Sequence, residues 1–338
     1  MKFMLERMCS GLDQSEAGGR AVLATALILL ATLTASAAVA QVAQPVRLIV
    51  PFASGGGTDV VARILAPYLA ENTKRSVIVE NKPGAGGAIA TAFVAHASPD
   101  GMTILVGSSS TMGSSPALMS TLPYDVLKDF VAVGKIHSSE NVLVVHPSVP
   151  VNDLRAFIAY AKANPGQVSY GSSGLGSTYH LGTELFAVRA GIVLTHVPYK
   201  GAGPAAQDLL AGHIQMMMET LYNALPSIRA GRLKALGIAS ASRNPSLPDV
   251  RTFSEQGLSN CEFSNWTGLF LPARASNALI GELNASLNKV LSHPDVKERF
   301  LKLGLQPAPG TPEDLAATVR TDIARWRETV RLARIKAE

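Results

Sequence analysis

Glycine-rich segments that directly follow apolar runs are the part of this sequence best suited to bind an anion. The first is PFASGGGTDVVAR, residues 51–63, where Gly55, Gly56 and Gly57 separate a strand-like run from a helix-like stretch. The first N–H groups of a helix have no partner within the helix, and the helix dipole adds positive potential there. Such a loop can receive a phosphate or a carboxylate, although a tight turn without a ligand would use the same residues.

Two nucleotide-binding patterns fail at this loop. A dinucleotide fingerprint requires G-x-G-x-x-G, but Val60 occupies the place of the third glycine. A Walker-type phosphate loop requires a lysine followed by a hydroxyl residue, and no lysine follows these glycines. The pattern therefore argues against a nucleotide and leaves a smaller anion as the candidate ligand.

Similar junctions of glycine, serine and threonine recur along the chain. They lie in residues 80–93, 106–115, 170–186 and 198–208, each after an apolar run. In open parallel sheets, ligands bind beyond the carboxyl ends of the strands, so these junctions are expected to face one crevice. Many N–H and hydroxyl donors, with few cationic side chains among them, favour a carboxylate ligand.

Catalytic and metal-binding patterns are weak. The nucleophile elbow G-x-S-x-G fails around Ser173 because Leu175 stands where the last glycine should be. An exported serine hydrolase using Ser173 and His180 remains an alternative hypothesis. The seven histidines are scattered and form neither HExxH nor an i, i+4 pair. We therefore expect no enzymatic activity, no metal site and no cofactor.

Glu219 ends the apolar run IQMMMET, residues 214–220. The three methionines are typical of a buried strand. A carboxylate at the end of such a strand either caps a neighbouring helix or faces the crevice, and the sequence leaves both possibilities open.

The N-terminal part of the chain has the features of an export signal. Residues 21–40 are uncharged and apolar, and they end in Ala38-Val39-Ala40, a small-x-small cleavage pattern. We expect cleavage after residue 40 and export to the periplasm, with an uncleaved membrane anchor as the alternative. The mature chain then retains only Cys261 and can form no internal disulfide. The net charge of +5 is spread without a basic block and gives no indication of a nucleic-acid partner.

Apolar runs and helix-like stretches alternate after residue 41, which predicts an α/β fold with largely parallel strands. Strands are predicted at residues 46–52, 76–81, 103–109, 130–136, 141–147, 168–173, 193–199, 214–220, 233–240 and 265–272. Thr311 and Pro312 predict the start of a C-terminal helix, and Leu315, Val319 and Ile323 begin its apolar stripe.

Five segments, in this order, resemble Bug-type extracytoplasmic solute receptors, the binding components of tripartite tricarboxylate transport systems. They are VRLIVPFASGGGTDVVAR, VIVENKPGAGGAIA, YGSSGLGSTYHLGTELF, HVPYKGAGPAAQDLLAGHIQ and LKALGIAS. The resemblance covers about residues 44–330. It implies a two-lobed, type II periplasmic-binding-protein fold of the Venus-flytrap kind, in which each lobe is a mixed, mainly parallel sheet flanked by helices.

The resemblance also implies how the chain is divided and which residues bind. Residues 41–142 and 264–338 would form lobe 1, and residues 143–263 would form lobe 2. Loops of both lobes would clamp a small carboxylate, and a membrane permease would then receive it from a monomeric receptor; a ligand-sensing adaptor for a membrane kinase is the alternative. The predicted ligand-binding residues are Phe52, Ala53, Gly56, Gly57, Thr58, Asp59, Asn81, Gly86, Ser108, Ser109, Ser173, Gly174, Gly176, Ser177, Thr178, His180 and Glu219.

Overall fold

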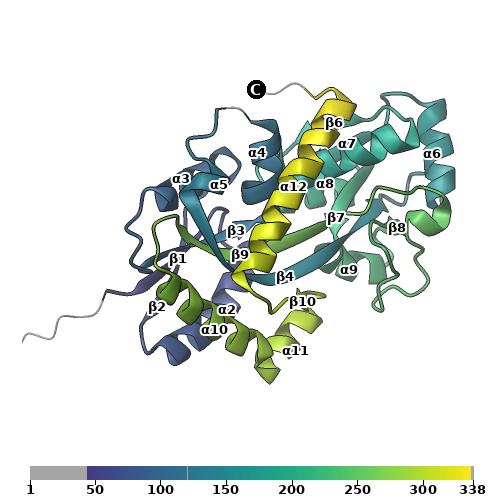
Figure 1. Ribbon diagram of the computed structural model, residues 1–338. Helices are drawn as coiled ribbons and strands as arrows, with labels where there is room; N and C mark the ends of the chain where they lie inside the picture. The colour runs from purple at the N-terminus through teal and green to yellow at the C-terminus, as the bar shows by residue number, and fades with distance from the viewer. Residues whose placement is uncertain (1–43, 120, 336–338) are drawn as a thin grey trace, which may run out of the picture. The chain divides into compact units, whose positions relative to one another are not determined.

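The computed structural model describes residues 44–119 and 121–335 (Figure 1). The described residues from Pro45 onward form one compact unit. The predicted export signal, residues 1–40, lies outside the described residues.

Each of the predicted apolar runs contains a strand, which confirms the α/β class. The strands are β1 (Val46–Val50), β2 (Val77–Asn81), β3 (Thr103–Ser108), β4 (Phe130–Val145), β5 (Ser169–Ser172), β6 (Thr195–Pro198), β7 (Met216–Thr220), β8 (Lys234–Ile238), β9 (Ser264–Pro272) and β10 (Gln306–Pro307). The two runs predicted at 130–136 and 141–147 form a single strand, β4, because the polar residues between them continue the ladder with β9. The short strand β10 was not predicted.

Helices separate most of these strands. They are α2 (Gly57–Thr73), α3 (Ala88–Ala95), α4 (Ser115–Leu118), α5 (Val126–Asp129), α6 (Leu154–Ala163), α7 (Thr178–Ala190), α8 (Ala202–Ala211), α9 (Leu221–Arg229), α10 (Asn277–Ser292), α11 (Pro294–Lys302) and α12 (Pro312–Ala333), with shorter turns η1 (Ala85–Gly87), η2 (Ser110–Ser114) and η3 (Ser254–Gln256). Thr311 caps α12 as predicted, since its hydroxyl accepts a hydrogen bond from Asp314 N.

Strand β4 joins two groups of strands. Along residues 130–140 it pairs with β9, which in turn pairs with β3, and β1 lies between β2 and β3; we call these strands, with β10, the first strand group. Along residues 141–145 it pairs with β7 and β8, and β5 lies between β7 and β6; these form the second strand group. In the described part of the chain, the parallel pairs are β1–β2, β1–β3, β5–β6 and β5–β7, and every antiparallel ladder contains β4 or β9.

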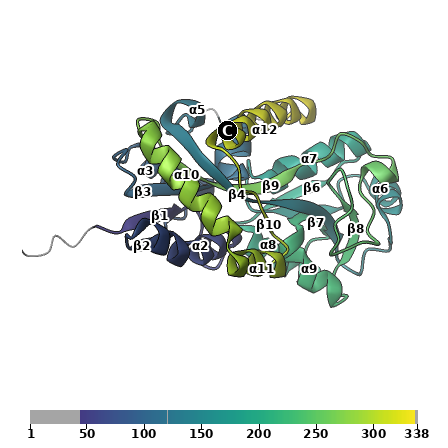
Figure 2. The ribbon, with the colours of Figure 1, turned by 60° about the horizontal axis from the view of Figure 1, so that its bottom comes forward.

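Both faces of each strand group are covered by helices, so successive strand residues point into different cores. In the first strand group, Leu48 packs under α2, α10 and α11, whereas Ile49 packs under α3 and α12 (Figures 1 and 2). In the second, Met216 and Met218 pack with α6 and α7, and Met217 packs with α8 and α9. The methionines therefore form buried strand, as predicted.

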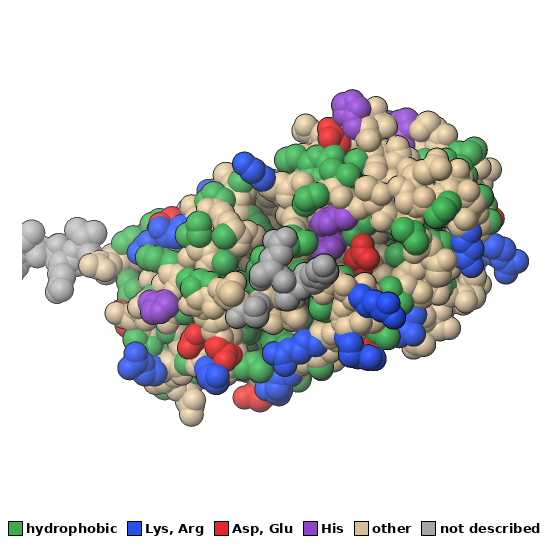
Figure 3. Space-filling view, turned by 90° about the horizontal axis from the view of Figure 1, so that it is seen from above, with side chains coloured by type: hydrophobic (Ala, Val, Ile, Leu, Met, Phe, Trp, Pro, Cys, Tyr) green, Lys and Arg blue, Asp and Glu red, His purple; other side chains and the backbone are tan. Residues whose placement is uncertain are grey.

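This arrangement places the candidate loops. The loops that follow β1, β2 and β3 leave the carboxyl edge of the first strand group, and those that follow β5 and β7 leave the carboxyl edge of the second. Seen from above, one face of the molecule mixes apolar and charged side chains, and its basic side chains gather along the lower right edge (Figure 3).

Candidate ligand-binding site

The loop between β1 and α2 is held from below by Asp59. This carboxylate is only 1% exposed and accepts hydrogen bonds from Gly55 N at 2.8 Å, Asn81 Nδ2 at 2.9 Å and Arg63 Nε at 3.0 Å. Burial alone would raise the pKa of Asp59, but the bonds from Arg63, Gly55 and Asn81 outweigh it and lower the pKa. Asp59 therefore orders the loop as an anion.

Asn81, at the end of β2, serves the same loop. Its amide nitrogen donates to Phe52 O at 3.0 Å as well as to Asp59, and its amide oxygen accepts from Arg63 Nη2 at 3.1 Å. Both ends of this predicted ligand-binding side chain thus hold the first loop in place.

The N-terminus of α2 carries no side-chain cap. Its N-cap residue is Gly56, so the N–H groups of Gly57 and Thr58 lack a partner within the helix. Directly across lies Tyr222 of α9, whose hydroxyl would stand 1.9 Å from a Cβ placed on Gly57. The first loop of one strand group therefore meets a side chain of the other at this glycine.

Hydroxyl groups of both strand groups converge at Thr178, the first residue of α7. Its Oγ1 lies 3.2 Å from Ser109 Oγ, 3.1 Å from Ser110 Oγ and 3.4 Å from Ser114 Oγ. Ser109 Oγ also donates to Asn265 Oδ1 of β9 at 2.9 Å. These bonds bring the loop after β3 against the helix that follows β5.

Ser108 is turned away from this group of hydroxyls. Its Oγ lies 3.4 Å from Thr111 Oγ1 and accepts from Thr111 N at 3.3 Å, so the side chain closes the turn that starts η2. Gly86 lies in the loop after β2, with φ of 63° in the left-handed region and an exposed surface. Neighbouring Gly87 packs against Thr111 and Pro51, which joins the loops after β1, β2 and β3.

The serine-glycine loop after β5 is shaped by its own side chains. Ser177 Oγ accepts from His180 N at 3.3 Å and donates to Gly174 O at 2.7 Å, so Ser177 caps α7. Gly174 and Gly176 have φ of 122° and 73°, which other residues rarely adopt. Ser173 stays half-buried, and its hydroxyl makes no hydrogen bond to the residues described here.

Two neutral histidines lie beneath this loop. Ser172 Oγ is 2.6 Å from His196 Nε2, and Gly176 N donates to His180 Nδ1 at 3.2 Å. Burial lowers the pKa of His180 to about 3 and that of His196 to about 4. Ser172 thus contacts the ring of His196, whereas within the described chain Ser173 forms no hydrogen bond with His180.

Glu219 is buried at the end of β7. Its Oε1 accepts from Thr220 N at 2.8 Å and from Asn223 Nδ2 at 3.3 Å, so it ties the residue before α9 to the first turn of that helix, although α9 has no side-chain cap. Its Oε2 is buried and has no hydrogen-bond partner among the described residues. Burial raises the pKa of Glu219, and the neighbouring Thr220, Asn223 and Tyr179 offset this only in part.

The sequence did not single out several residues that build this region. Tyr179 and His196 stand within the segments that resemble the receptor family, but they were not predicted to bind, and no motif marks Tyr222. Tyr222 contacts Gly57, a residue far away in the sequence. The only available signal was the glycine itself, since a glycine at the first turn of a helix can mark a close approach.

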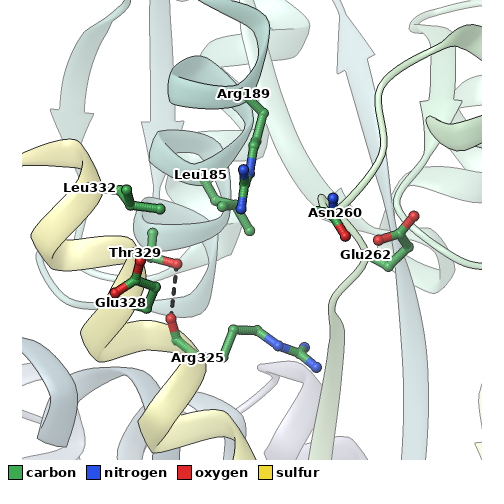
Figure 4. A pocket seen from close by; sticks show the side chains of 8 residues that line it. All are labelled: Leu185, Arg189, Asn260, Glu262, Arg325, Glu328, Thr329 and Leu332. Atoms are coloured by element: carbon green, nitrogen blue, oxygen red, sulfur yellow. Dashed lines mark hydrogen bonds between the residues drawn. The ribbon is translucent and has the colours of Figure 1, made fainter.

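A separate cavity of about 310 Å³ lies between α7, α12 and the loop before β9 (Figure 4). It is lined by Leu185, Arg189, Asn260, Glu262, Arg325, Glu328, Thr329 and Leu332. None of the predicted ligand-binding residues lines it. Within residues 44–119 and 121–335, His, Cys, Asp and Glu side chains form no group of three that could hold a metal ion. No helix in the same part of the chain combines the length and apolar character needed to cross a bilayer.

Comparison with known proteins identifies the family. Residues 61–334 match the model of the tripartite tricarboxylate transporter family receptors. BugT of Bordetella pertussis is 39% identical over 290 residues, which cover 86% of this chain and 89% of BugT.

Solved structures show the same fold. MatC from Rhodopseudomonas palustris with bound malate is 35% identical, has a TM-score of 0.80, and is matched over 85% of this chain and 99% of MatC. An R. palustris protein with adipate is 33% identical, has a TM-score of 0.81, and is matched over 86% of this chain and 97% of that protein. The mixed sheet flanked by helices is therefore a periplasmic-binding-protein fold, and the chain belongs to the tripartite tricarboxylate transporter receptor family.

Proposed function

We propose that the chain is a periplasmic receptor that binds a small organic carboxylate between two lobes and delivers it to a membrane permease. Lobe 1 comprises residues 41–142 and 264–338, and lobe 2 comprises residues 143–263. Family membership supports this function, as do the malate and adipate present in two similar structures. The protein acts by binding alone, as a monomer, after removal of residues 1–40.

The observation that carries the proposal is the uncapped N-terminus of α2 opposite the second strand group. The N–H groups of Gly57 and Thr58 are free to bind an anion, and the helix dipole favours negative charge there. Asp59 and Asn81 fix the loop that presents them. A carboxylate at this point would replace the cap that Gly56 cannot supply.

Donors from the other lobe would complete the clamp. The hydroxyl of Ser173 has no hydrogen-bond partner among the described residues, and Thr178 already lies against Ser109 at the junction of the two strand groups. A ligand that bridges both loops stabilises the closed arrangement only through its higher affinity for that arrangement. The permease would then recognise the closed pair of lobes rather than the ligand itself.

Thermal unfolding of the mature chain, beginning at Gln41, tests the proposal. We expect at least one member of a panel of mono-, di- and tricarboxylates to raise the unfolding temperature, since a ligand at about a hundred times its Kd adds about 2.7 kcal/mol. The proposal would be contradicted if no carboxylate raised the unfolding temperature while a sugar or a metal ion raised it strongly.

Two substitutions locate the site. Ser173→Ala should weaken binding of the stabilising carboxylate about tenfold, because one hydroxyl donor to an anion is lost. The control is Ser242→Ala, because Ser242 is exposed and uses only its backbone oxygen in a hydrogen bond. Equal affinities of the two variants would remove the serine-glycine loop from the site.

A further inference from the structure

The two oxygens of Glu219 have unequal surroundings. Oε1 accepts hydrogen bonds from Thr220 N, from Thr220 Oγ1 at 3.1 Å and from Asn223 Nδ2. Oε2 has no partner among the described residues, although the side chain is only 3% exposed. No described lysine or arginine forms an ion pair with this carboxylate.

The hydrogen bonds to Oε1 do not explain Oε2. They need only one acceptor oxygen, which an amide side chain would also provide. Burying a second carboxylate oxygen without a donor is unfavourable. A buried polar atom without a partner therefore calls for a separate explanation, such as a role in binding.

Strand register places Glu219 at the proposed site. In the parallel pair of β5 and β7, Tyr170 lies opposite Met216 and Gly171 lies opposite Met217. Continued by two residues, this register puts Glu219 level with Ser173, at the carboxyl edge where ligands bind in such sheets.

Two residues that follow Glu219 contact the first turn of α7 and the first loop. Tyr179, in that turn of α7, places its hydroxyl 3.5 Å from Oγ1 of Thr220, the residue next to Glu219. Tyr222, three residues beyond Glu219, reaches Gly57 at the N-terminus of α2. Glu219 is therefore followed by residues that contact both the first turn of α7 and the loop that would hold the carboxylate.

We propose that Glu219 Oε2 accepts a hydrogen bond from a hydroxyl or ammonium group of the ligand, so that the receptor selects carboxylates that carry such a donor. This inference rests on the proposed function and adds the ligand class to it. A site built to bond a donor discriminates strongly against an analogue without one, because the buried acceptor is then left unpaired. Two carboxylates facing each other without a donor between them would also repel.

Calorimetric titration of the mature chain with matched acids tests this inference. The first series is propionate, lactate and alanine; the second is succinate, malate and aspartate; the third is glutarate, 2-hydroxyglutarate and glutamate. Within each series, hydrogen, hydroxyl and ammonium occupy the same carbon. In the series that binds, we expect a donor-bearing acid to bind at least about tenfold more tightly than the plain acid. Whether the hydroxy acid or the amino acid of that series binds more tightly distinguishes a hydroxyl ligand from an ammonium ligand.

Glu219→Gln tests the residue itself. Its amide oxygen can keep the hydrogen bonds from Thr220 and Asn223, while its NH₂ group replaces Oε2 and turns an acceptor into a donor. We expect the preference for the donor-bearing acid to fall to about onefold, with binding of the plain acid unchanged or tighter. Asn223→Ala is the matched control, because it removes a donor to Oε1 and leaves Oε2 untouched; its preference should equal that of the unaltered chain.

The outcomes separate this inference from the proposed function. If a plain acid binds as tightly as its donor-bearing analogues, or if Glu219→Gln keeps the preference, the inference is wrong and the receptor function stands. If no acid of these series binds but another carboxylate of the thermal panel does, the inference is also wrong. If no carboxylate binds at all, both are wrong. If Glu219→Gln does not fold, the affinity ratios of donor-bearing to plain acids for the unaltered chain still test the inference.

Discussion

The imidazole rings of His180 and His196 stack with their centroids 4.1 Å apart and their planes 10° from parallel. Tyr170 continues the stack on His196, with ring centroids 4.8 Å apart. The stack joins β5, β6 and α7 beneath the serine-glycine loop. Burial, together with the neighbouring His196, holds the pKa of His180 near 3, so the stacked rings are neutral at neutral pH.

We expect the stack to make the protein less stable in mild acid. The unfolded histidines take up protons near their ordinary pKa of 6.5, whereas folded His196 does so only near 4. Between these values the unfolded state binds more protons, so the free energy of unfolding falls as pH decreases, by up to about 1.4 kcal/mol per pH unit per histidine. Buried His137, whose pKa is lowered to about 4, adds to the same slope.

Urea unfolding at several pH values between about 7 and about 4.5 measures this slope. His196→Gln should reduce the slope by about one histidine's share. His96→Gln is the control, because His96 lies exposed at the end of α3. Equal slopes for His196→Gln and the unaltered chain would show that the stack does not control the acid sensitivity.

Gly57→Ala should disturb the contact between α2 and α9. The added methyl group would stand 1.9 Å from the Tyr222 hydroxyl, so one of the two elements must move. We expect a loss of about 1–3 kcal/mol in the free energy of unfolding, as for other overpacked sites, and weaker carboxylate binding.

Two companion variants isolate the cause of that effect. Gly203→Ala, in the first turn of α8, has open space around the new methyl group and should be neutral or slightly stabilising. In a chain that already carries Tyr222→Ala, Gly57→Ala should cost little stability, because the tyrosine hydroxyl no longer occupies the space of the new methyl group. If the two substitutions are additive instead, the Gly57–Tyr222 contact does not explain the loss.

Local patterns predicted most of the fold. Strands buried on both faces are uninterrupted apolar runs, so each run could be found without its partners. The break expected between residues 136 and 141 was wrong, because His137 and Ser139 are polar but buried in the continuous strand β4. In a single sequence, a polar residue between two apolar runs can indicate either the end of a strand or a buried position within it. The residues opposite it in the sheet determine which of these occurs.

The candidate site was predictable only in part. Gly57, Ser177 and Thr178 stand in recognisable loop-to-helix patterns. Asp59 is among the predicted ligand-binding residues, but its carboxylate accepts hydrogen bonds from Gly55 N and Arg63 Nε and so orders the loop. Tyr222 could not be found, because its contact with Gly57 depends on how two distant helices are placed. Pairs of this kind leave no periodic trace in a single sequence.

Asp59→Ala should destabilise the protein by about 3 kcal/mol, since it leaves the donors of Gly55 and Asn81 and the charge of Arg63 without their shared acceptor. The folded pKa of Asp59 lies below its ordinary value, so its contribution is present above that value and is lost as pH falls through the folded pKa.

Chemical unfolding near neutral pH measures this loss. Asp249→Ala, at an exposed aspartate, is the matched control and should change the free energy of unfolding by less than about 0.5 kcal/mol. A similarly small effect of Asp59→Ala would mean that the loop keeps its form without the carboxylate.

Cys261 offers a way to follow folding and ligand binding with one thiol. Its side chain is 1% exposed, and burial raises the pKa of the thiol to about 12. The reactive thiolate is therefore scarce and inaccessible in the folded chain. We expect a thiol reagent to label the folded mature chain very slowly and the chain in guanidinium at once.

Labelling should slow further when a stabilising carboxylate is present. If the thiol reacts only after the chain opens, a ligand at about a hundred times its Kd lowers the open population, and with it the labelling rate, about a hundredfold. The Cys261→Ser variant checks that no other group reacts. If the folded chain is labelled as fast as the chain in guanidinium, the thiol is accessible in the folded state. If a tightly bound carboxylate leaves the labelling rate unchanged, the region around Cys261 opens independently of the ligand site.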